Sequence, residues 1–143
     1  MSPRTTILHA DRIKGDIHLG GKKAPRDADP DMPLWVVNVT DSLPDFGDGR
    51  RGRRHMRVPL SDATSRESRR IYRARYRDAH EFIDEALRRG ATVLVHCELG
   101  VSRSATLLCH YLVRRRGMRW EDAERLLRKR RPRARPSRWL AGV

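Results

Sequence analysis

One nine-residue stretch constrains the fold of this chain more than any other: His96-Cys97-Glu98-Leu99-Gly100-Val101-Ser102-Arg103-Ser104. It places a thiol and a guanidinium six positions apart, with a glycine between them. An apolar run, Thr92 to Val95, precedes the stretch, and a segment with helical periodicity, Ser104 to Arg116, follows it. This order predicts a buried strand, a tight loop and a helix, with Cys97 at the end of the strand and Arg103 at the start of the helix. A loop of this kind can hold a phosphate and attack it.

The rest of the chain alternates between strand-like and helix-like patterns. We expect a short edge strand within Ile13–Leu19, strands at 34–39, 56–60 and 92–96, helices at 68–89, 104–116 and 121–130, and a last turn at 137–140. Gly90 and Gly117 follow the first two helical segments, where glycine commonly ends a helix. The pattern predicts an α/β fold with a central mixed, mostly parallel β-sheet of four to five strands flanked by helices. The Cys-x5-Arg loop is expected between a central strand and a helix.

The length of the chain limits how many domains it can form, and its cysteine content indicates its cellular location. A chain of 143 residues suffices for one domain with one core. We therefore expect residues 1–143 to form a single domain, with residues 1–6 frayed. No apolar run is long enough to span a membrane or to act as a leader. Cys97 and Cys109 are too few for a disulfide framework, which favours a reducing, cytoplasmic location.

The residue types in the loop suit the chemistry of a thiolate nucleophile. The thiolate is the reactive form of cysteine, and a helix N-terminus stabilises an anion through its unpaired N–H groups. Gly100 lets the backbone turn tightly, so that the neighbouring N–H groups can converge on one point. Arg103 supplies a planar fork for two phosphate oxygens, and the Ser104 hydroxyl can hydrogen-bond the sulfur of Cys97. The phosphate-binding residues expected on these grounds are Glu98, Leu99, Gly100, Val101, Ser102 and Arg103.

The stretch from His96 to Ser104 resembles the HCxxGxxR[S/T] signature of the cysteine-based protein tyrosine phosphatases. The wider run from Val93 to Thr106 is similar to their small, atypical dual-specificity branch in particular. Four further segments resemble landmarks of that family and occur in the same order along the chain: Ile17–Gly21, Val37–Thr40, Val58–Asp62 and Arg130–Pro132. The resemblance covers residues 13–140. It implies a hydrolase that works through a phosphocysteine and needs no cofactor.

The same resemblance implies a general acid, an aspartate on a loop before the cysteine. Asp62 lies 35 residues before Cys97 and follows the strand-like segment 56–60. We expect it to protonate the leaving oxygen and then to act as a base on water. Asp62 could instead cap the turn that follows it, and the competing acids are Asp41, Asp45 and Asp48.

Histidine has a smaller expected part in this chemistry. The resemblance implies that His96 hydrogen-bonds inside the loop and tunes the thiolate. The other histidines show no metal-ligand spacing with each other or with the cysteines, so no metal site is expected.

The charge of the chain is strongly positive and uneven. The formal net charge is +14, and basic residues concentrate in 50–77 and 114–138. Such a surface attracts phosphates, nucleic acid or acidic lipid over a screening length of about 8–10 Å. Only four of the 32 basic residues are lysine, so a codon bias toward arginine explains the charge as simply. Two interpretations stay open: acidic or polyanionic partners bind the arginine-rich surface, or the charge is incidental.

These observations predict a phosphoprotein phosphatase in which Cys97, Arg103, Asp62 and Ser104 are the catalytic residues. The loop interior, Glu98 to Ser102, has no lysine, which by resemblance argues against inositol lipids. A shallow site of the small branch could admit phosphoserine and phosphothreonine beside phosphotyrosine. Phosphorylated proteins are the expected partners, with no obligatory nucleic acid. The alternatives are an RNA 5′-phosphatase or triphosphatase on the same fold, and a phosphate-binding module with vestigial activity.

Overall fold

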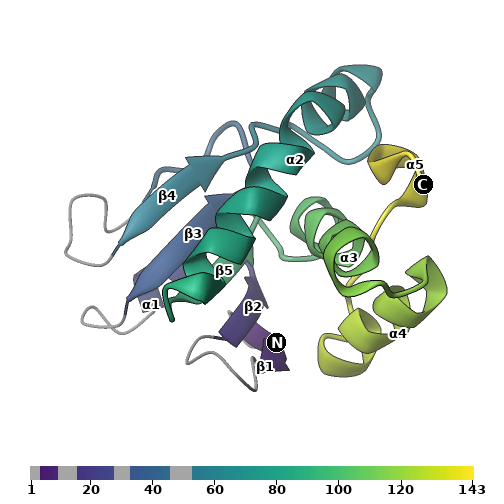
Figure 1. Cartoon of the computed structure of the whole chain (residues 1–143). Coiled ribbons are helices and arrows are strands. Elements are labelled where there is room, and N and C mark those ends of the chain that lie inside the picture. Colours follow the sequence, from purple (N-terminus) through teal and green to yellow (C-terminus); the bar gives the residue numbers. More distant parts are fainter. Residues whose placement is uncertain (1–3, 10–15, 28–32, 46–52) are drawn as a thin grey trace.

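The computed structural model describes residues 4–9, 16–27, 33–45 and 53–143. Within these residues one sheet contains five strands: β1 (Arg4–His9), β2 (Asp16–Gly20), β3 (Leu34–Asn38), β4 (Arg54–Arg57) and β5 (Thr92–His96). The helices are α1 (Ala24–Asp27), α2 (Arg66–Arg88), α3 (Arg103–Arg116), α4 (Trp120–Arg130) and α5 (Arg138–Ala141) (Figure 1). No helix of the described part has the length and apolar character needed to cross a membrane.

Strand β5 lies at the centre of the sheet, whose order is β1-β2-β5-β3-β4. β2 and β3 pair with β5 in parallel, β4 pairs with β3 in parallel, and β1 is antiparallel to β2. The expected mixed, mostly parallel sheet is therefore confirmed. The register pairs His96 with Gly20 on one side and with Asn38 on the other. The carboxyl ends of three strands thus meet where the Cys97 loop begins.

The two faces of the sheet are covered unequally, because successive strand residues point to opposite sides. Val93 and Val95 of β5 belong to the main core, which also contains the apolar sides of α2, α3 and α4. Leu94 lies in a small cluster on the other face, with Ala24 of α1 and two β3 residues. Figure 1 shows α2 and α3 side by side against the main-core face. All five residues of β5 are buried, as expected for a strand covered on both faces.

Helix α2 is bounded by local signals and held by its apolar side. Ser65 Oγ accepts a hydrogen bond from the N–H of Ser68 at 3.1 Å, which caps the first turn. Gly90 follows the last turn with φ of 74°, a left-handed value that favours glycine. The buried side chains of α2 recur at helical spacing, and they include Tyr72, Tyr76, Ala79, Ile83 and Ala86. The helix therefore starts directly after the 58–65 segment, which contains Asp62.

The structure corrects three expectations. Residues 4–6 belong to β1, where Thr5 pairs with Leu19, so a frayed end at 1–6 is wrong for these residues; residues 1–3 lie outside the described part. β2 is consequently an inner strand and not an edge strand. β4 covers 54–57 and not 56–60. Pro59 has no N–H to donate, and the last bond to β3 is from Val58 N to Asn38 O at 2.9 Å.

Candidate active site

Cys97 sits at the carboxyl end of the central strand, under the start of α3. Its N–H reaches the Gly20 carbonyl at 3.4 Å, which continues the pairing with β2 for one more residue. The side chain is 2% exposed, and its sulfur lies 3.1 Å from the Ser104 hydroxyl oxygen in the first turn of α3. The fold thus brings Cys97 and Ser104 together across the loop.

The loop between them is held from outside through its carbonyl groups. Each of the four carbonyls from Glu98 to Val101 accepts a hydrogen bond from another part of the chain. The pairs are Lys22 N to Glu98 O (2.7 Å), Arg131 Nη2 to Leu99 O (3.1 Å), Arg131 Nε to Gly100 O (3.1 Å) and Arg135 N to Val101 O (2.6 Å).

This outward anchoring decides where the N–H groups of the loop point. In a planar trans peptide the C=O and the following N–H point in opposite directions. Because the four carbonyls face donors outside the loop, the N–H groups of residues 99–102 face inward. They form a concave group of donors beside the sulfur of Cys97, which suits an anion. The backbone of the expected phosphate-binding residues therefore has the geometry of an anion nest.

Gly100 is required by this packing. Its φ is +67°, a conformation that L side chains rarely adopt. A Cβ atom at this position would lie 2.7 Å from the Gly20 carbonyl oxygen and 2.7 Å from Nη2 of Arg131. The loop can pass this close to β2 and to Arg131 only because residue 100 has no side chain.

The structure places Arg131 against the loop, and no role was expected for it. It follows α4, is 2% exposed, and donates to the Thr5 hydroxyl at 3.1 Å as well as to the loop. Burial lowers the pKa of its guanidinium, and attraction to the Cys97 thiolate opposes this shift. The Arg130–Pro132 landmark pointed to this segment. Arg131 lies 31 residues after Gly100 in the chain. No periodicity or spacing in the sequence indicates that its side chain is buried under the loop.

Arg103 begins α3 and connects the loop to the segment before α2. Its Nη1 donates to the Leu60 carbonyl at 2.8 Å, and its Nη2 lies 3.9 Å from the Glu98 carboxylate. The side chain is 13% exposed. A guanidinium has five N–H groups, so these contacts leave donors for an anion in the loop. Arg103 is thus held beside the loop at the start of α3, and its part in binding phosphate stays a prediction.

Asp62 lies two residues beyond the carbonyl that Arg103 holds. Its Oδ1 accepts hydrogen bonds from the N–H groups of Thr64 (2.9 Å) and Ser65 (2.7 Å). The Ser65 and Thr64 donors hold the pKa of this carboxyl below its usual value, because they stabilise the ionised form. Within the described part, the hydrogen bonds of Asp62 all go to residues 64–68. The structure gives Asp62 the turn-capping contacts that were the alternative interpretation, on a segment that adjoins the loop.

The competing acids are placed differently. Asp41 is exposed on the loop after β3. Asp45 pairs with Arg57 at 3.2 Å and accepts from Asn38 at 3.0 Å, so its carboxylate is committed to that loop. Asp48 lies outside the described residues.

His96 is buried as the last residue of β5. A hydrogen-bonding contact with the backbone of Cys97, at the start of the loop, raises the pKa of its ring against the effect of burial, and its expected part in tuning the thiolate stays a prediction. As the last residue of β5, His96 points to the face opposite Val95. The charged groups that act on it belong to β4 and the loop before it: Asp45, His55 and Arg57. Burial lowers the pKa of His96 to about 4, which leaves the ring neutral at pH 7.

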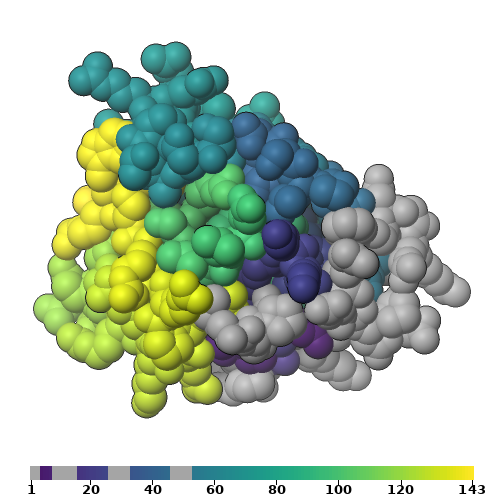
Figure 2. Space-filling model, turned by 180° about the vertical axis from the view of Figure 1, so that it is seen from behind, coloured from purple at the N-terminus to yellow at the C-terminus, as the bar shows by residue number. Residues whose placement is uncertain are grey.

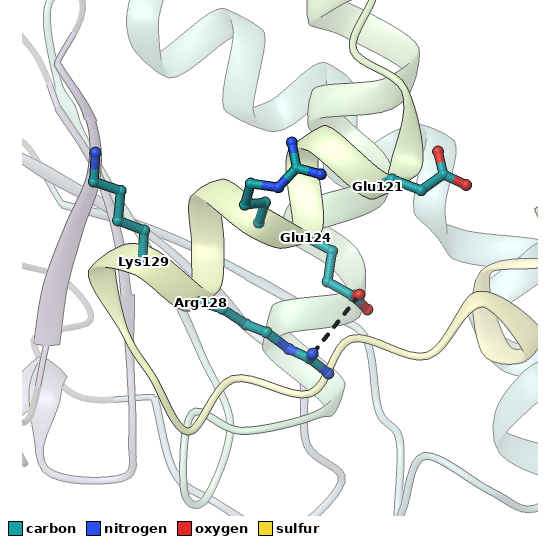
Figure 3. Close-up of a pocket in the computed structure, with 5 residues that line it drawn as sticks. Glu121, Glu124, Arg128 and Lys129 are labelled. Atoms are coloured by element: carbon teal, nitrogen blue, oxygen red, sulfur yellow. Dashed lines mark ion pairs between the residues drawn. The ribbon is translucent and has the colours of Figure 1, made fainter.

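Two cavities lie away from the loop. One of about 520 Å³ lies along α4 and is lined by Glu121, Glu124, Arg125, Arg128 and Lys129. Figure 3 shows Glu124 and Arg128 pointing toward each other across it, and their charged groups are 3.9 Å apart. The other, of about 270 Å³, lies at the opposite end of the sheet beside Trp35 and Arg54. No residue from 96 to 104 lines either cavity.

Comparison with known proteins agrees with this geometry. The family model of the dual specificity phosphatase catalytic domain matches residues 34–141. Human dual specificity protein phosphatase 9 is 35% identical over 103 residues, which are 72% of this chain and 26% of that protein. Drosophila dual specificity protein phosphatase Mpk3 is also 35% identical over 103 residues, which are 24% of its length. The chain thus spans about a quarter of these two relatives. The crystal structure of human DUSP28 superposes with a TM-score of 0.77 at 26% identity, over 99% of this chain and 90% of that one.

Proposed function

Because the chain belongs to the dual specificity phosphatase family, we propose that it is a phosphoprotein phosphatase acting through a phosphocysteine intermediate. Its substrates are phosphotyrosine and, at a shallow site, phosphoserine and phosphothreonine. The observation that carries the proposal is the anion nest: four outward-anchored carbonyls beside a buried thiol. Phosphorylated proteins are the partners.

The first step forms a bond between sulfur and phosphorus. The Cys97 thiolate attacks the phosphorus while the inward N–H groups and Arg103 bind the nonbridging oxygens. The bond to the leaving oxygen breaks, and this oxygen takes a proton from Asp62. The lowered pKa of Asp62 opposes this role in the free protein. The approach of a phosphate dianion favours the protonated form, because a nearby negative charge raises a carboxyl pKa.

The second step regenerates the thiolate. A water molecule attacks the phosphorus, the Asp62 carboxylate accepts a proton from that water, and the S–P bond breaks with its electron pair on sulfur. The Ser104 hydroxyl, 3.1 Å from the sulfur, donates a hydrogen bond to the departing thiolate. Inorganic phosphate then leaves the nest.

The two cysteines allow a matched test of this chemistry. Cys97→Ser is expected to abolish hydrolysis of p-nitrophenyl phosphate, whereas Cys109→Ser is expected to retain it. Burial raises the pKa of the Cys109 thiol to about 12, so it is not a nucleophile at pH 7. Acid quenching during turnover of a ³²P-labelled phosphotyrosyl peptide should leave label on Cys97. Activity that survives Cys97→Ser, or faster hydrolysis of an RNA 5′-triphosphate than of any phosphopeptide, would reject the proposal.

The charge around the site supports a preference for acidic phosphoproteins. Figure 2 shows the face with the loop at its centre (green), between the C-terminal segment (yellow) and the first turns of α2 (teal). The ion pairs of α2 lie in its second half, at Glu81, Asp84 and Glu85. Arg66 and Arg70, in its first turns, are exposed and have no carboxylate partner among the described residues. Cations at a helix N-terminus oppose the helix dipole, so helix stability does not account for them.

A pair of peptides tests this preference. A phosphotyrosyl peptide with Asp and Glu flanks should have a kcat/KM about tenfold above its Asn and Gln counterpart at low salt, with the ratio falling as salt rises. Arg66→Glu with Arg70→Glu should remove the difference. Arg75→Glu, on the same helix but about 180° away from Arg66, should leave it. Equal kcat/KM values for the two peptides would mean that the charge is incidental.

A further inference from the structure

We infer that Arg131 is a positioning residue, whose buried guanidinium fixes the loop in its anion-binding shape before any substrate arrives. The inference rests on the proposed function, since it concerns the same loop. Arg131 does not touch the reacting atoms in this account; it acts through the carbonyls of Leu99 and Gly100.

The contacts of Arg131 show what it holds. Nη2 and Nε donate to two successive loop carbonyls, each at 3.1 Å, and Nη1 donates to the Thr5 hydroxyl at 3.1 Å. Its backbone N–H bonds to the Leu127 carbonyl at 2.7 Å, which ties it to the last turn of α4. One planar side chain therefore joins the loop, β1 and α4. A lysine cannot do the same, because its donors leave from a single nitrogen.

Arg131 differs in kind from the other anchors of the loop. Glu98 O and Val101 O are held by backbone N–H groups, which every residue type except proline provides. Leu99 O and Gly100 O depend on the side chain of Arg131. If that side chain is removed, the buried Gly100 carbonyl and the half-buried Leu99 carbonyl both lose this donor, and the peptides that follow them are free to rotate. The N–H groups of Gly100 and Val101 would then no longer be fixed toward the anion.

The charge of Arg131 acts in the same direction. Attraction between the guanidinium and the Cys97 thiolate raises the pKa of Arg131 against the effect of burial. The same cation adds positive charge beside the place where the anion of the proposed reaction would bind. Loss of Arg131 should therefore weaken phosphate binding, even where no turnover is measured.

Three variants test this. Arg131→Met removes the donors and the charge, Arg131→Lys keeps the charge, and Arg130→Met is the matched control at the exposed neighbouring position. The measurements are the Kd for inorganic phosphate, and kcat and KM, each determined separately, for p-nitrophenyl phosphate. Circular dichroism and a thermal scan establish that each variant is folded.

For Arg131→Met we expect kcat/KM to fall about 100-fold, in the range seen when an oxyanion donor is lost. The Kd for phosphate should rise. Arg131→Lys should not restore the phosphate affinity, and Arg130→Met should match the wild type. Should Arg131→Met fail to fold, Arg131→Lys decides: wild-type phosphate affinity in that variant overturns the inference.

A folded Arg131→Met with wild-type phosphate affinity also overturns it. This measurement is independent of turnover. A wild-type protein that binds phosphate but hydrolyses no phosphopeptide would reject the proposed function and leave the role of Arg131 standing.

Discussion

Asp62 accepts two backbone hydrogen bonds, whereas the proposed mechanism requires it to donate a proton. Its carboxylate is favoured in the free protein, and a proton becomes useful only when a leaving oxygen needs one. The demand for this proton depends on the leaving group, since a basic oxygen departs poorly without it and an acidic phenol departs readily.

Asp62→Asn should therefore affect substrates unequally. Asparagine keeps an oxygen that can accept from Thr64 and Ser65, so the turn should persist. The kcat for phenyl phosphate is expected to fall about 100-fold or more, and the kcat for p-nitrophenyl phosphate much less. Asp41→Asn is the matched control at an exposed position. Equal losses on both substrates would mean that Asp62 only caps the turn before α2.

At the residue scale the sequence predicted residues that the structure brings together around one loop, and it missed Arg131. Cys97, Arg103 and Ser104 could be predicted because they lie within one short stretch, and their catalytic roles stay predictions. Arg131 was not assigned a role, because one buried arginine in an arginine-rich chain has no signal in composition or spacing.

At the scale of elements, the loop from β5 to α3 has its shape imposed by neighbours. Gly100 and Gly117 both have left-handed backbones, with φ of +67° and +69°, but only Gly100 is enclosed. No atom of the described residues lies within 4 Å of a Cβ built at Gly117. A comparison of these two glycines therefore distinguishes the cost of backbone strain from the cost of a steric clash with neighbouring atoms.

Alanine at these two glycines should have different consequences. Gly117→Ala is expected to lower the free energy of unfolding by about 1 kcal/mol, from backbone strain alone, and to leave kcat/KM unchanged. Gly100→Ala should cost more stability and reduce kcat/KM at least tenfold, because β2 or Arg131 must move. Urea denaturation and p-nitrophenyl phosphate kinetics measure both effects. An active Gly100→Ala would show that the loop tolerates a shift of its anchors.

The long helices could be predicted because their apolar residues recur with a strong helical periodicity. The short strands have weaker patterns, and two of them were predicted wrongly. The helices at 66–88, 103–116 and 120–130 lie within two residues of the expected bounds. β1 was missed because Arg4, Thr5 and Thr6 carry little apolar signal, and the strand is stabilised by pairing with β2. β4 was expected too late in the chain because the apolar residues Val58 and Leu60 suggested a strand there. Pro59 lies between them and cannot donate to a neighbouring strand, so the pairing ends before it.

Across the whole molecule, buried histidines link stability to pH. Burial lowers the pKa of His80 to about 3 and the pKa values of His96 and His110 to about 4. His80 and His110 lie between α2 and α3, where the His110 ring meets the Tyr72 hydroxyl at 2.7 Å. In the unfolded chain each histidine binds a proton near its ordinary pKa of 6.5.

Stability should therefore fall on acidification. Above pH 6.5 both states hold these rings neutral, and the full stability is present. Between pH 6.5 and about 4 the unfolded state binds more protons, so the free energy of unfolding falls. Each histidine contributes up to about 1.4 kcal/mol per pH unit. Urea denaturation at pH 7.5, 6 and 5 measures the slope, and His110→Asn should reduce it. A constant free energy of unfolding over this range would contradict the burial of the rings.

The four outward-anchored carbonyls have a consequence for variation far from Cys97. Their donors come from the turn after β2 and from the segment that follows α4, and Arg131 also reaches Thr5 in β1. A synthetic peptide of residues 92–116 would contain Cys97, Arg103 and Ser104, yet it would lack every one of these donors. The shape of the loop therefore depends on the tertiary fold, and a substitution that shifts the end of α4 also changes the surroundings of Cys97.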